Sequence, residues 1–207
     1  MKKICAYAIC KNEIKHVHRW LEQVKEADEV VVLDTGSTDG TWEVLENSDV
    51  CCFRKIIEPF RFDVARNEAL ALVPSDCEIC LPLDLDMILP IGWAMAVRCS
   101  WSADLCVLEI PQYFVPNNKS GVWFAHRRNA VTWKYPVYEQ LEYNGVRKPT
   151  ASTVILHDFS PDKETHGTYI SLANLAVAEN PNDPYCKIMR QKILEEHKKY
   201  FGTEKKE

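Results

Sequence analysis

The chain has 207 residues, the length of one domain of ordinary size or of one domain with a short appendage. Apolar residues make up 46% of it and charged residues 27%, a globular composition that is too apolar for disorder. The net charge is -5, from 25 Lys and Arg against 30 Asp and Glu, without the basic excess that binding to a phosphate backbone usually needs. Nucleic acid is therefore disfavoured as a ligand or acceptor, though not excluded.

Membrane-spanning and secretory segments are not indicated by the sequence. No stretch approaches the roughly 18 to 20 apolar residues of a membrane span. The opening MKKICAYAICKNE becomes charged before an apolar signal region could form. We therefore expect a cytoplasmic protein without a transmembrane segment, whose contact with the inner face of a membrane would be peripheral.

Nine cysteines are an odd and fairly high count. Cys51 and Cys52 are adjacent, and Cys77 and Cys80 form a single CxxC. A chain of this length does not need disulfides for stability, so we expect reduced thiols in the core. A zinc site built from these four cysteines is the alternative, but a lone CxxC in an apolar run is weak evidence for one.

The first 100 residues alternate between strand patterns and helix patterns. The predicted strands are 2–10, 29–34, 50–56 and 78–86, and the predicted helices are 11–29, 41–48, 62–73 and 91–101. Asp63 is expected to cap the third helix. Four such alternations favour a parallel α/β sheet with helices on both faces.

The second half has a different pattern. Three strands, at 104–114, 121–133 and 152–159, follow one another without intervening helices, which predicts an antiparallel addition to the sheet. Two helices are then expected at 166–181 and 183–201, where Pro181 and Pro184 interrupt the helical pattern.

The sharpest local feature is the pair Asp84 and Asp86 at the end of an apolar run. On an extended backbone, residues two apart point to the same side, so both carboxylates would face one direction. At about 5 Å apart they would repel by roughly 3 kcal/mol, so the pair favours a cation or a shared proton. Mg²⁺ or Mn²⁺ prefers carboxylate oxygens and leaves positions for substrate phosphates, which suits a nucleotide diphosphate. A solvated turn is the alternative.

A second feature is the sequence DTGSTDGT at 34–41, between a predicted buried strand and a helix. Open α/β sheets bind ligands at this position, and small residues let a ligand approach the backbone. The segment has neither the glycine spacing of GxGxxG nor the Gly-Lys-Ser/Thr of a Walker A loop. Dinucleotide oxidoreductase and P-loop functions are therefore not indicated. The segment can also cap the following helix, and this role does not exclude ligand binding.

Four motifs in order are more specific than any one of them: Lys11-Asn12-Glu13, LDTGSTDGT, Ala65-Arg66-Asn67 and DLD. In this combination the chain resembles family-2 glycosyltransferases, and is similar to the branch that includes enzymes of lipopolysaccharide core biosynthesis. That branch also has an HE motif close to a tryptophan. The segment WKYPVYE at 133–139 resembles this motif, but it has Tyr138 where the family usually has His. DLD stands where Asp-Ala-Asp is commoner. The resemblance covers roughly residues 3–158.

The resemblance implies a GT-A fold. This is an α/β fold with a Rossmann-like, mostly parallel central sheet flanked by helices, here with antiparallel additions and a C-terminal helical segment. It implies a glycosyltransferase domain at 1–160, made of a nucleotide-sugar half at about 1–100 and an acceptor half at about 101–160. The helices at 161–207 would pack on that domain.

The resemblance also implies the donor site. The nucleotide-sugar contacts would be Asn12, Glu13, Asp34, Arg66, Asp84 and Leu85. Asp86 would ligate a divalent metal, Mn or Mg, with His157 as a further ligand; a structural role is the alternative for His157. A contact between Arg66 and the donor also has a physical basis apart from the resemblance, because a guanidinium beside the loop can bind a diphosphate. A surface salt bridge is the alternative for Arg66.

Glu139 is the candidate catalytic base. Inverting transfer needs an acceptor hydroxyl made nucleophilic by a carboxylate, while the departing diphosphate needs its charge neutralised. Glu139 follows an aromatic segment with Trp133, Tyr135 and Tyr138, whose ring faces suit sugar rings. The alternative is that these aromatic side chains are core and that Glu139 is exposed.

We therefore predict an inverting, metal-dependent glycosyltransferase that moves a hexose-like sugar from a nucleoside diphosphate donor, UDP by resemblance, to a hydroxyl. A glycan, a lipid-linked or another hydroxyl acceptor fits equally. One alternative is a nucleotidyltransferase or phosphoryl-transfer enzyme using the same two carboxylates, which would want a third carboxylate and a basic signature loop. Another is a non-catalytic sugar-nucleotide-binding module, favoured if Glu139 does not face the donor site.

Overall fold

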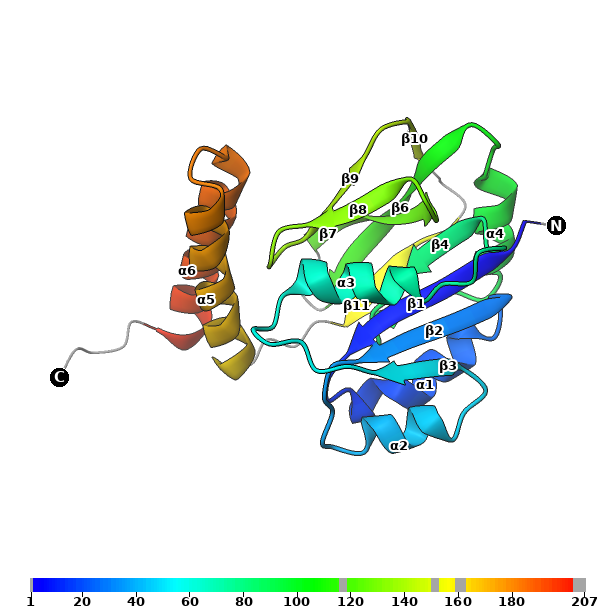
Figure 1. The fold of residues 1–207 in the computed structure, drawn as a ribbon, viewed down its shortest axis with the longest axis horizontal. Coiled ribbons are helices and arrows are strands. Elements are labelled where there is room, and N and C mark those ends of the chain that lie inside the picture. The colour runs from blue at the N-terminus through cyan, green and yellow to red at the C-terminus, as the bar shows by residue number, and fades with distance from the viewer. Residues whose placement is uncertain (1, 116–118, 150–152, 159–162, 203–207) are drawn as a thin grey trace.

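The computed structural model describes residues 2–115, 119–149, 153–158 and 163–202. Its first half confirms the predicted alternation of strands and helices (Figure 1). The strands are β1 (Ile4–Cys10), β2 (Glu29–Asp34), β3 (Cys51–Arg54), β4 (Ile79–Pro82) and β5 (Met87–Ile88). The helices are α1 (Ile14–Val24), α2 (Thr41–Glu46), α3 (Phe62–Ala71) and α4 (Trp93–Ser100).

The main sheet has the strand order β3-β2-β1-β4-β7-β6-β11-β5. β1, β2, β3 and β4 are parallel, and β7 (Lys119–Arg127) runs antiparallel to both β4 and β6 (Leu105–Val115). β11 (Ile155–Asp158) and β10 (Val146–Pro149) both pair with β6 in the parallel sense. The carboxyl ends of β1, β2 and β4 therefore share one edge, where open α/β sheets hold their ligands.

The two faces of β1 belong to two different cores, because successive residues of a strand point to opposite faces. Ala6 and Ala8 lie in the larger core, with apolar residues of α1, α2 and α4. Tyr7 and Ile9 lie in the other core, with residues of α3. Helices on both faces explain why the sequence of this strand is a continuous apolar run rather than an alternating one.

β6 and β7 are antiparallel, as predicted, but β11, which was also expected in the antiparallel addition, is parallel to β6 and antiparallel only to β5. The second half also contains more strands than the sequence indicated. The predicted strand at 121–133 is in fact two: β7, and β8 (Val131–Lys134), which pairs with β9 (Gln140–Tyr143) in a separate hairpin. β5, β9 and β10, with two to four residues each, were not predicted. The strand expected at 152–159 is confirmed over β11, and positions 152 and 159 lie outside the described residues.

α3 begins at Phe62, with Arg61 in the capping position, so the prediction that Asp63 caps this helix is wrong. The Asp63 carboxylate instead accepts hydrogen bonds from Arg61 Nε at 3.1 Å and Nη2 at 2.9 Å. It also accepts one from the amide of Val64, in the same first turn. A negative charge in the first turn still favours the helix, because the helix dipole is positive there.

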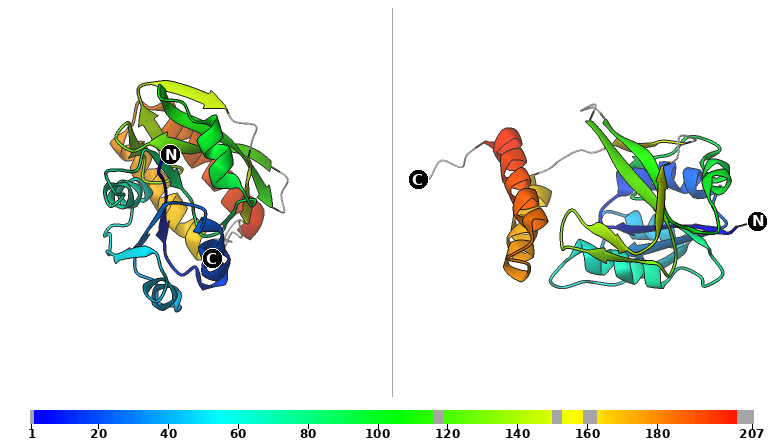
Figure 2. Two further views of the ribbon diagram at one scale, coloured as in Figure 1. Left: turned by 90° about the vertical axis from the view of Figure 1, so that its right-hand side faces the viewer. Right: turned by 90° about the horizontal axis from the view of Figure 1, so that it is seen from above.

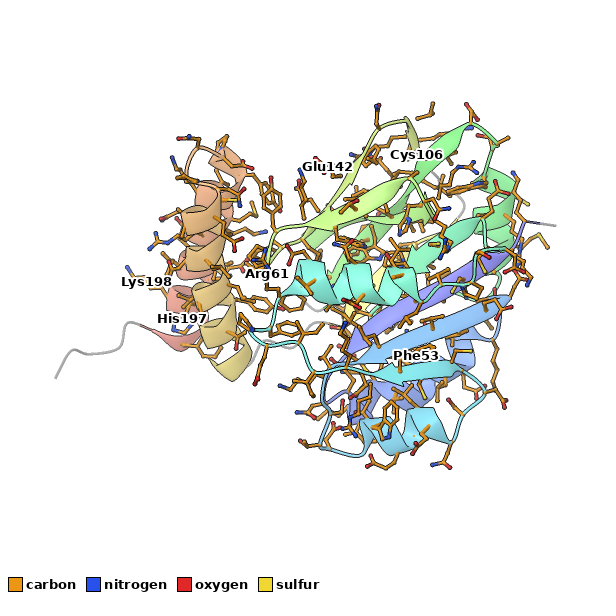
Figure 3. The ribbon with its side chains drawn as sticks, viewed as in Figure 1. Phe53, Arg61, Cys106, Glu142, His197 and Lys198 are labelled. Atoms are coloured by element: carbon orange, nitrogen blue, oxygen red, sulfur yellow. The ribbon has the colours of Figure 1, made fainter. Side chains whose placement is uncertain are left out.

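α5 (Lys163–Glu179) and α6 (Pro184–Phe201) form a helical hairpin on the opposite side of the molecule from the N-terminus (Figures 1 and 2). Tyr169 of α5 meets Phe62 edge to face, with ring centroids 5.6 Å apart. Arg61, at the same junction in Figure 3, donates from Nη1 to Glu179 at 2.6 Å. Among the helices of the described residues, none has both the length and the apolar character needed to cross a bilayer.

The cysteines are mostly in the core. Six are buried: Cys5, Cys10, Cys77, Cys80, Cys106 and Cys186. The expectation of core thiols is wrong for Cys51 and Cys99, which are exposed. The zinc alternative does not fit, because β2 and β1 separate β3, which carries Cys51, from β4, which carries Cys80. Three strand spacings amount to about 14 Å, too far for one tetrahedral site.

Candidate active site

A cavity of about 300 Å³ lies between the sheet and the C-terminal hairpin. Four predicted site residues line it: Arg66 from α3, Asp84 after β4, Glu139 after β8 and His157 from β11. The hairpin closes the other side with Tyr169, Lys192 and Glu196. Residues from separate motifs along the chain therefore share one space.

Arg66 joins the two carboxylates of this cavity. Its Nη1 and Nη2 donate to the two oxygens of Asp84 at 2.5 and 2.6 Å, and its Nε donates to Glu139 Oε1 at 3.0 Å. The Arg66 side chain is only 3% exposed, so this is a buried ion pair rather than the surface salt bridge of the alternative interpretation. Burial alone lowers the pKa of Arg66, but Asp84 and Glu139 outweigh it and raise that pKa well above its usual range.

Two tryptophans hold the guanidinium of Arg66. Its Cζ lies 5.6 Å from the ring centroid of Trp123 and 5.5 Å from that of Trp133. Trp133 Nε1 donates to the Tyr7 hydroxyl at 2.8 Å, which in turn lies 2.8 Å from His126 Nε2. Burial lowers the pKa of His126 to about 4, so this imidazole is neutral. Its Nδ1 donates to the Arg127 carbonyl at 3.1 Å, which leaves Nε2 to accept from the Tyr7 hydroxyl. Trp133 is therefore a core residue, which agrees with the alternative interpretation of the aromatic segment. Tyr138, in contrast, lines the cavity.

The expectation that Asp84 and Asp86 point the same way from an extended strand is wrong. A turn between β4 and β5 contains Leu85 and Asp86, so the two carboxylates have different partners. Asp84 meets Arg66, whereas Asp86 Oδ2 lies 2.8 Å from His157 Nε2. The Leu85 side chain is buried in the core, so only its backbone is near the site edge.

His157 is held from both sides. Gln112 Nε2 lies 3.2 Å from its Nδ1, opposite the contact with Asp86. Burial alone lowers the pKa of His157, but the hydrogen bond and charge of Asp86, with a smaller contribution from Asp84, raise it overall. The strand end therefore presents an imidazole in a fixed orientation beside a carboxylate.

Glu13 adds a further acidic side chain to this edge of the sheet. Desolvation, followed by the charges of Asp86, Asp84 and Asp39, raises the pKa of the Glu13 carboxyl to about 8. Carboxylates that disfavour one another's ionisation in this way create a negative potential. A cation bound at this edge would be stabilised by it.

Asn12 and Asp34 shape the loop that follows β2. The Asp34 side chain has no exposed surface, and its Oδ1 accepts from the amides of Gly36 at 2.9 Å and Ser37 at 3.0 Å. Asn12 is exposed, and its Oδ1 accepts from the amide of Thr38 at 2.8 Å. In this conformation Asp34 acts on the loop, whereas Asn12 and the loop backbone form the surface available to a ligand.

The backbone is strained at three positions around the site. Asn12, Tyr135 and Tyr138 are the non-glycine residues with positive φ in the described part of the chain, at 59°, 76° and 50°. Such conformations cost energy and persist only where surrounding contacts impose them. At Tyr138 the hydroxyl donates to Glu196 Oε2 at 2.9 Å, and Tyr185 Oη donates to the Tyr138 carbonyl at 2.7 Å. α6 therefore fixes the residue that precedes Glu139.

The sequence analysis did not assign several residues of the cavity to the site, among them Gln112, Tyr169, Lys192 and Glu196. Lys192 and Glu196 are four residues apart, a spacing that places them on one helix face. That spacing indicates a shared helix face, but it does not tell which face of α6 meets the rest of the molecule. Only the packing of the hairpin decides this.

Asp86 and His157 suit a divalent cation. Two ligand atoms about 2.1 Å from a metal and at right angles are about 3.0 Å apart, close to the observed 2.8 Å between Asp86 Oδ2 and His157 Nε2. Within the described ranges, no group of three or more His, Cys, Asp or Glu side chains is arranged to hold a metal. A pair of ligands fits an ion such as Mg²⁺, which completes its shell with phosphates and water.

Comparison with known proteins gives consistent results. The family model described as Glycosyl transferase family 2 matches residues 7–197. S. aureus TarS 1-349 in complex with UDP-GlcNAc is similar, with a TM-score of 0.61 at 14% identity over 96% of this chain and 73% of that one. Glucosyl-3-phosphoglycerate synthase from Mycobacterium tuberculosis in complex with phosphoglyceric acid gives 0.62 at 14%, over 86% and 79%. These likenesses confirm the predicted GT-A fold with its C-terminal helical segment.

Two further results complete the comparison. The chain spans 44% of the longer crystallised S. aureus TarS chain, at a TM-score of 0.58 and 16% identity. No curated protein matches the sequence. A complex of the mycobacterial synthase with Mn²⁺, UDP and glucosyl-3-phosphoglycerate is also similar, with a TM-score of 0.56 at 14% identity over 84% of this chain and 78% of that one.

Proposed function

Because this chain belongs to glycosyl transferase family 2, we propose that it is an inverting, metal-dependent glycosyltransferase. It transfers a hexose-like sugar from a UDP-linked donor to an acceptor hydroxyl. One observation carries this proposal: the same cavity is lined by Asp84, Glu139, Arg66 and His157. Similar structures were obtained with UDP-GlcNAc, and with Mn²⁺ and UDP, which supports the choice of donor and metal.

Glu139 is the proposed base. Its Oε1 accepts from Arg66, and its side chain is 11% exposed, in the wall of the cavity. A carboxylate is the form of this side chain that accepts a proton from an acceptor hydroxyl. Arg66 thus orients Glu139 and Asp84 together, and Asp84 lies on the donor side of the cavity.

Asp86 and His157 are the proposed protein ligands of Mn²⁺ or Mg²⁺. Bound there, the ion would offset the negative charge that develops on the departing diphosphate. Asn12, Glu13 and the backbone of the loop shaped by Asp34 form the proposed nucleotide surface. The Asp86 carboxylate would itself repel a diphosphate, so these assignments imply that UDP binding depends on the cation.

Calorimetric titration with UDP tests the donor site. We expect binding to wild type only with Mn²⁺, and its loss in Asp86→Ala, because the cation then has one protein ligand fewer. Glu139→Gln is expected to bind UDP with Mn²⁺ as wild type does, but not to hydrolyse UDP-glucose, UDP-galactose or UDP-N-acetylglucosamine, a reaction in which water takes the sugar and UDP leaves. The matched control is Glu142→Gln, on β9 (Figure 3), whose side chain is 57% exposed.

Each outcome has a distinct meaning. Absence of UDP binding under all conditions would overturn the UDP-sugar proposal. UDP binding with equal turnover in wild type and Glu139→Gln would remove Glu139 as the base. UDP binding without turnover of any of the three donors by wild type would favour a non-catalytic sugar-nucleotide-binding module.

A further inference from the structure

A second cavity, of about 370 Å³, adjoins the first. The two cavities share Gln112, Trp123, Tyr138 and Glu139. The rest of the second lining comes from β7, β9, β10 and the start of α6: Val122, Phe124, Gln140, Leu141, Tyr143, Arg147 and Tyr185. Asp84, Arg66 and His157 line the first cavity and are not among the residues that line the second. Glu139 therefore stands at the boundary between a space with the donor machinery and a space without it.

This position of Glu139 matters because a base for sugar transfer must contact the acceptor hydroxyl while that hydroxyl approaches the donor. An acceptor in the second cavity meets this requirement, since Glu139 lines both spaces. We propose that the second cavity is the acceptor subsite and that it takes a neutral sugar ring. This inference rests on the proposed glycosyltransferase function and adds the chemical class of the acceptor.

The charges of the lining favour a neutral ligand. Arg147 is the only cation among the described residues that line the second cavity. It is paired with the Glu109 carboxylate, its Nη1 donates to the Tyr143 hydroxyl at 3.2 Å, and its Cζ lies 5.3 Å from the ring centroid of Phe124. An anionic acceptor would have to compete with Glu109 for this guanidinium and would face the carboxylate of Glu139.

The other lining residues match a sugar. Phe124, Tyr143 and Tyr185 provide aromatic rings, and the negative face of such a ring attracts the partly positive C–H bonds of a pyranose. The amide of Gln140 and the hydroxyl of Tyr143 can bond with sugar hydroxyls. A lipid chain has no polar groups with which they could bond. The volume lies within the range of about 300–1,000 Å³ for small-molecule sites.

Saturation-transfer NMR with neutral methyl glycosides tests this subsite. Methyl glucoside, methyl galactoside and methyl mannoside are the probes, with glycerol 3-phosphate as the anionic comparison, all in the presence of UDP and Mn²⁺. We expect at least one glycoside to bind wild type, and its affinity to fall about tenfold in Tyr143→Ala, since an aromatic contact is lost. Phe53→Ala, on the distant strand β3, is the control (Figure 3).

A UDP titration on the same samples separates the two proposals. Failure of wild type to bind UDP counts against the glycosyltransferase proposal. With UDP bound, three results overturn the neutral subsite: no glycoside binds, glycosides bind equally to wild type and Tyr143→Ala, or glycerol 3-phosphate binds in preference. If Tyr143→Ala does not fold, Gln140→Ala replaces it, because Gln140 is exposed and its loss removes one hydrogen bond to the sugar.

Discussion

At the scale of single residues, the positive charge of Arg66 compensates two carboxylates, Asp84 and Glu139. Arg66→Ala leaves both in the cavity without their partner, and breaking a buried ion pair costs about 3–5 kcal/mol. Because the Asp84 side chain is 24% exposed, water screens part of this cost. We expect the free energy of unfolding, measured with urea, to fall by about 2–3 kcal/mol.

A matched substitution separates this effect from the loss of any surface cation. Lys55 pairs with Glu68 where both side chains are exposed, so we expect Lys55→Ala to cost less than about 1 kcal/mol. The double variant Arg66→Ala/Asp84→Asn should recover part of the lost stability, since one unpaired charge is removed. If Arg66→Ala and Lys55→Ala were equally stable, Arg66 would not be the charge that compensates the carboxylates of the cavity.

At the scale of elements, the C-terminal hairpin holds the loop that carries Glu139. Tyr138, at φ 50°, donates to Glu196 of α6, and Tyr135, at φ 76°, donates to Asp183 at 2.5 Å. Tyr138→Phe keeps the ring and removes only the hydrogen bond from the hydroxyl to Glu196. We expect release of UDP from UDP-sugars to slow by roughly tenfold, because a misplaced base loses rate.

Binding measurements distinguish this role from general destabilisation. The affinity for UDP with Mn²⁺ should change little in Tyr138→Phe, because neither the proposed metal ligands nor the nucleotide surface includes Tyr138. Glu195→Gln, next to Glu196 and exposed, is the control and should retain wild-type turnover. Unchanged turnover in Tyr138→Phe would show that the hairpin does not position the base.

At the scale of the whole molecule, the buried His126 makes stability depend on pH. Burial lowers the pKa of His126 to about 4 in the folded state, whereas the unfolded chain has the ordinary value of about 6.5. The unfolded state therefore binds a proton first as the pH falls. The contribution of His126 is present above pH 6.5 and is lost progressively down to pH 4, by about 3 kcal/mol.

Variants isolate this contribution from those of other titrating groups. Urea unfolding between pH 7 and pH 4 should show a shallower loss of stability for His126→Gln than for wild type. His18→Gln, at an exposed position of α1, should retain the wild-type slope. Equal slopes for wild type and His126→Gln would mean that His126 is not held neutral.

Much of the fold was predictable because its signals are local. Apolar runs such as that of β1 indicate strands buried on both faces, and the alternation with helices indicates a parallel sheet. The short strand β5 was missed because it is held by pairing with β11, far along the chain, whereas β9 pairs with the neighbouring strand β8 in a hairpin that was not predicted. Asp63 was misassigned because a helix boundary depends on backbone geometry that composition alone does not fix.

The sequence by itself determined the alternation of strands and helices in the first half, the family and the motif residues proposed for the site, because motif residues and hydrophobic periods are written along the chain. Tertiary structure decided which of these residues meet. It joined Arg66 to Asp84 and Glu139, paired Asp86 with His157, and buried Asp34 beneath its own loop. It also brought Lys192 and Glu196 over the cavity. These contacts link positions far apart in sequence, and they depend on sheet order and helix packing, for which no local pattern exists.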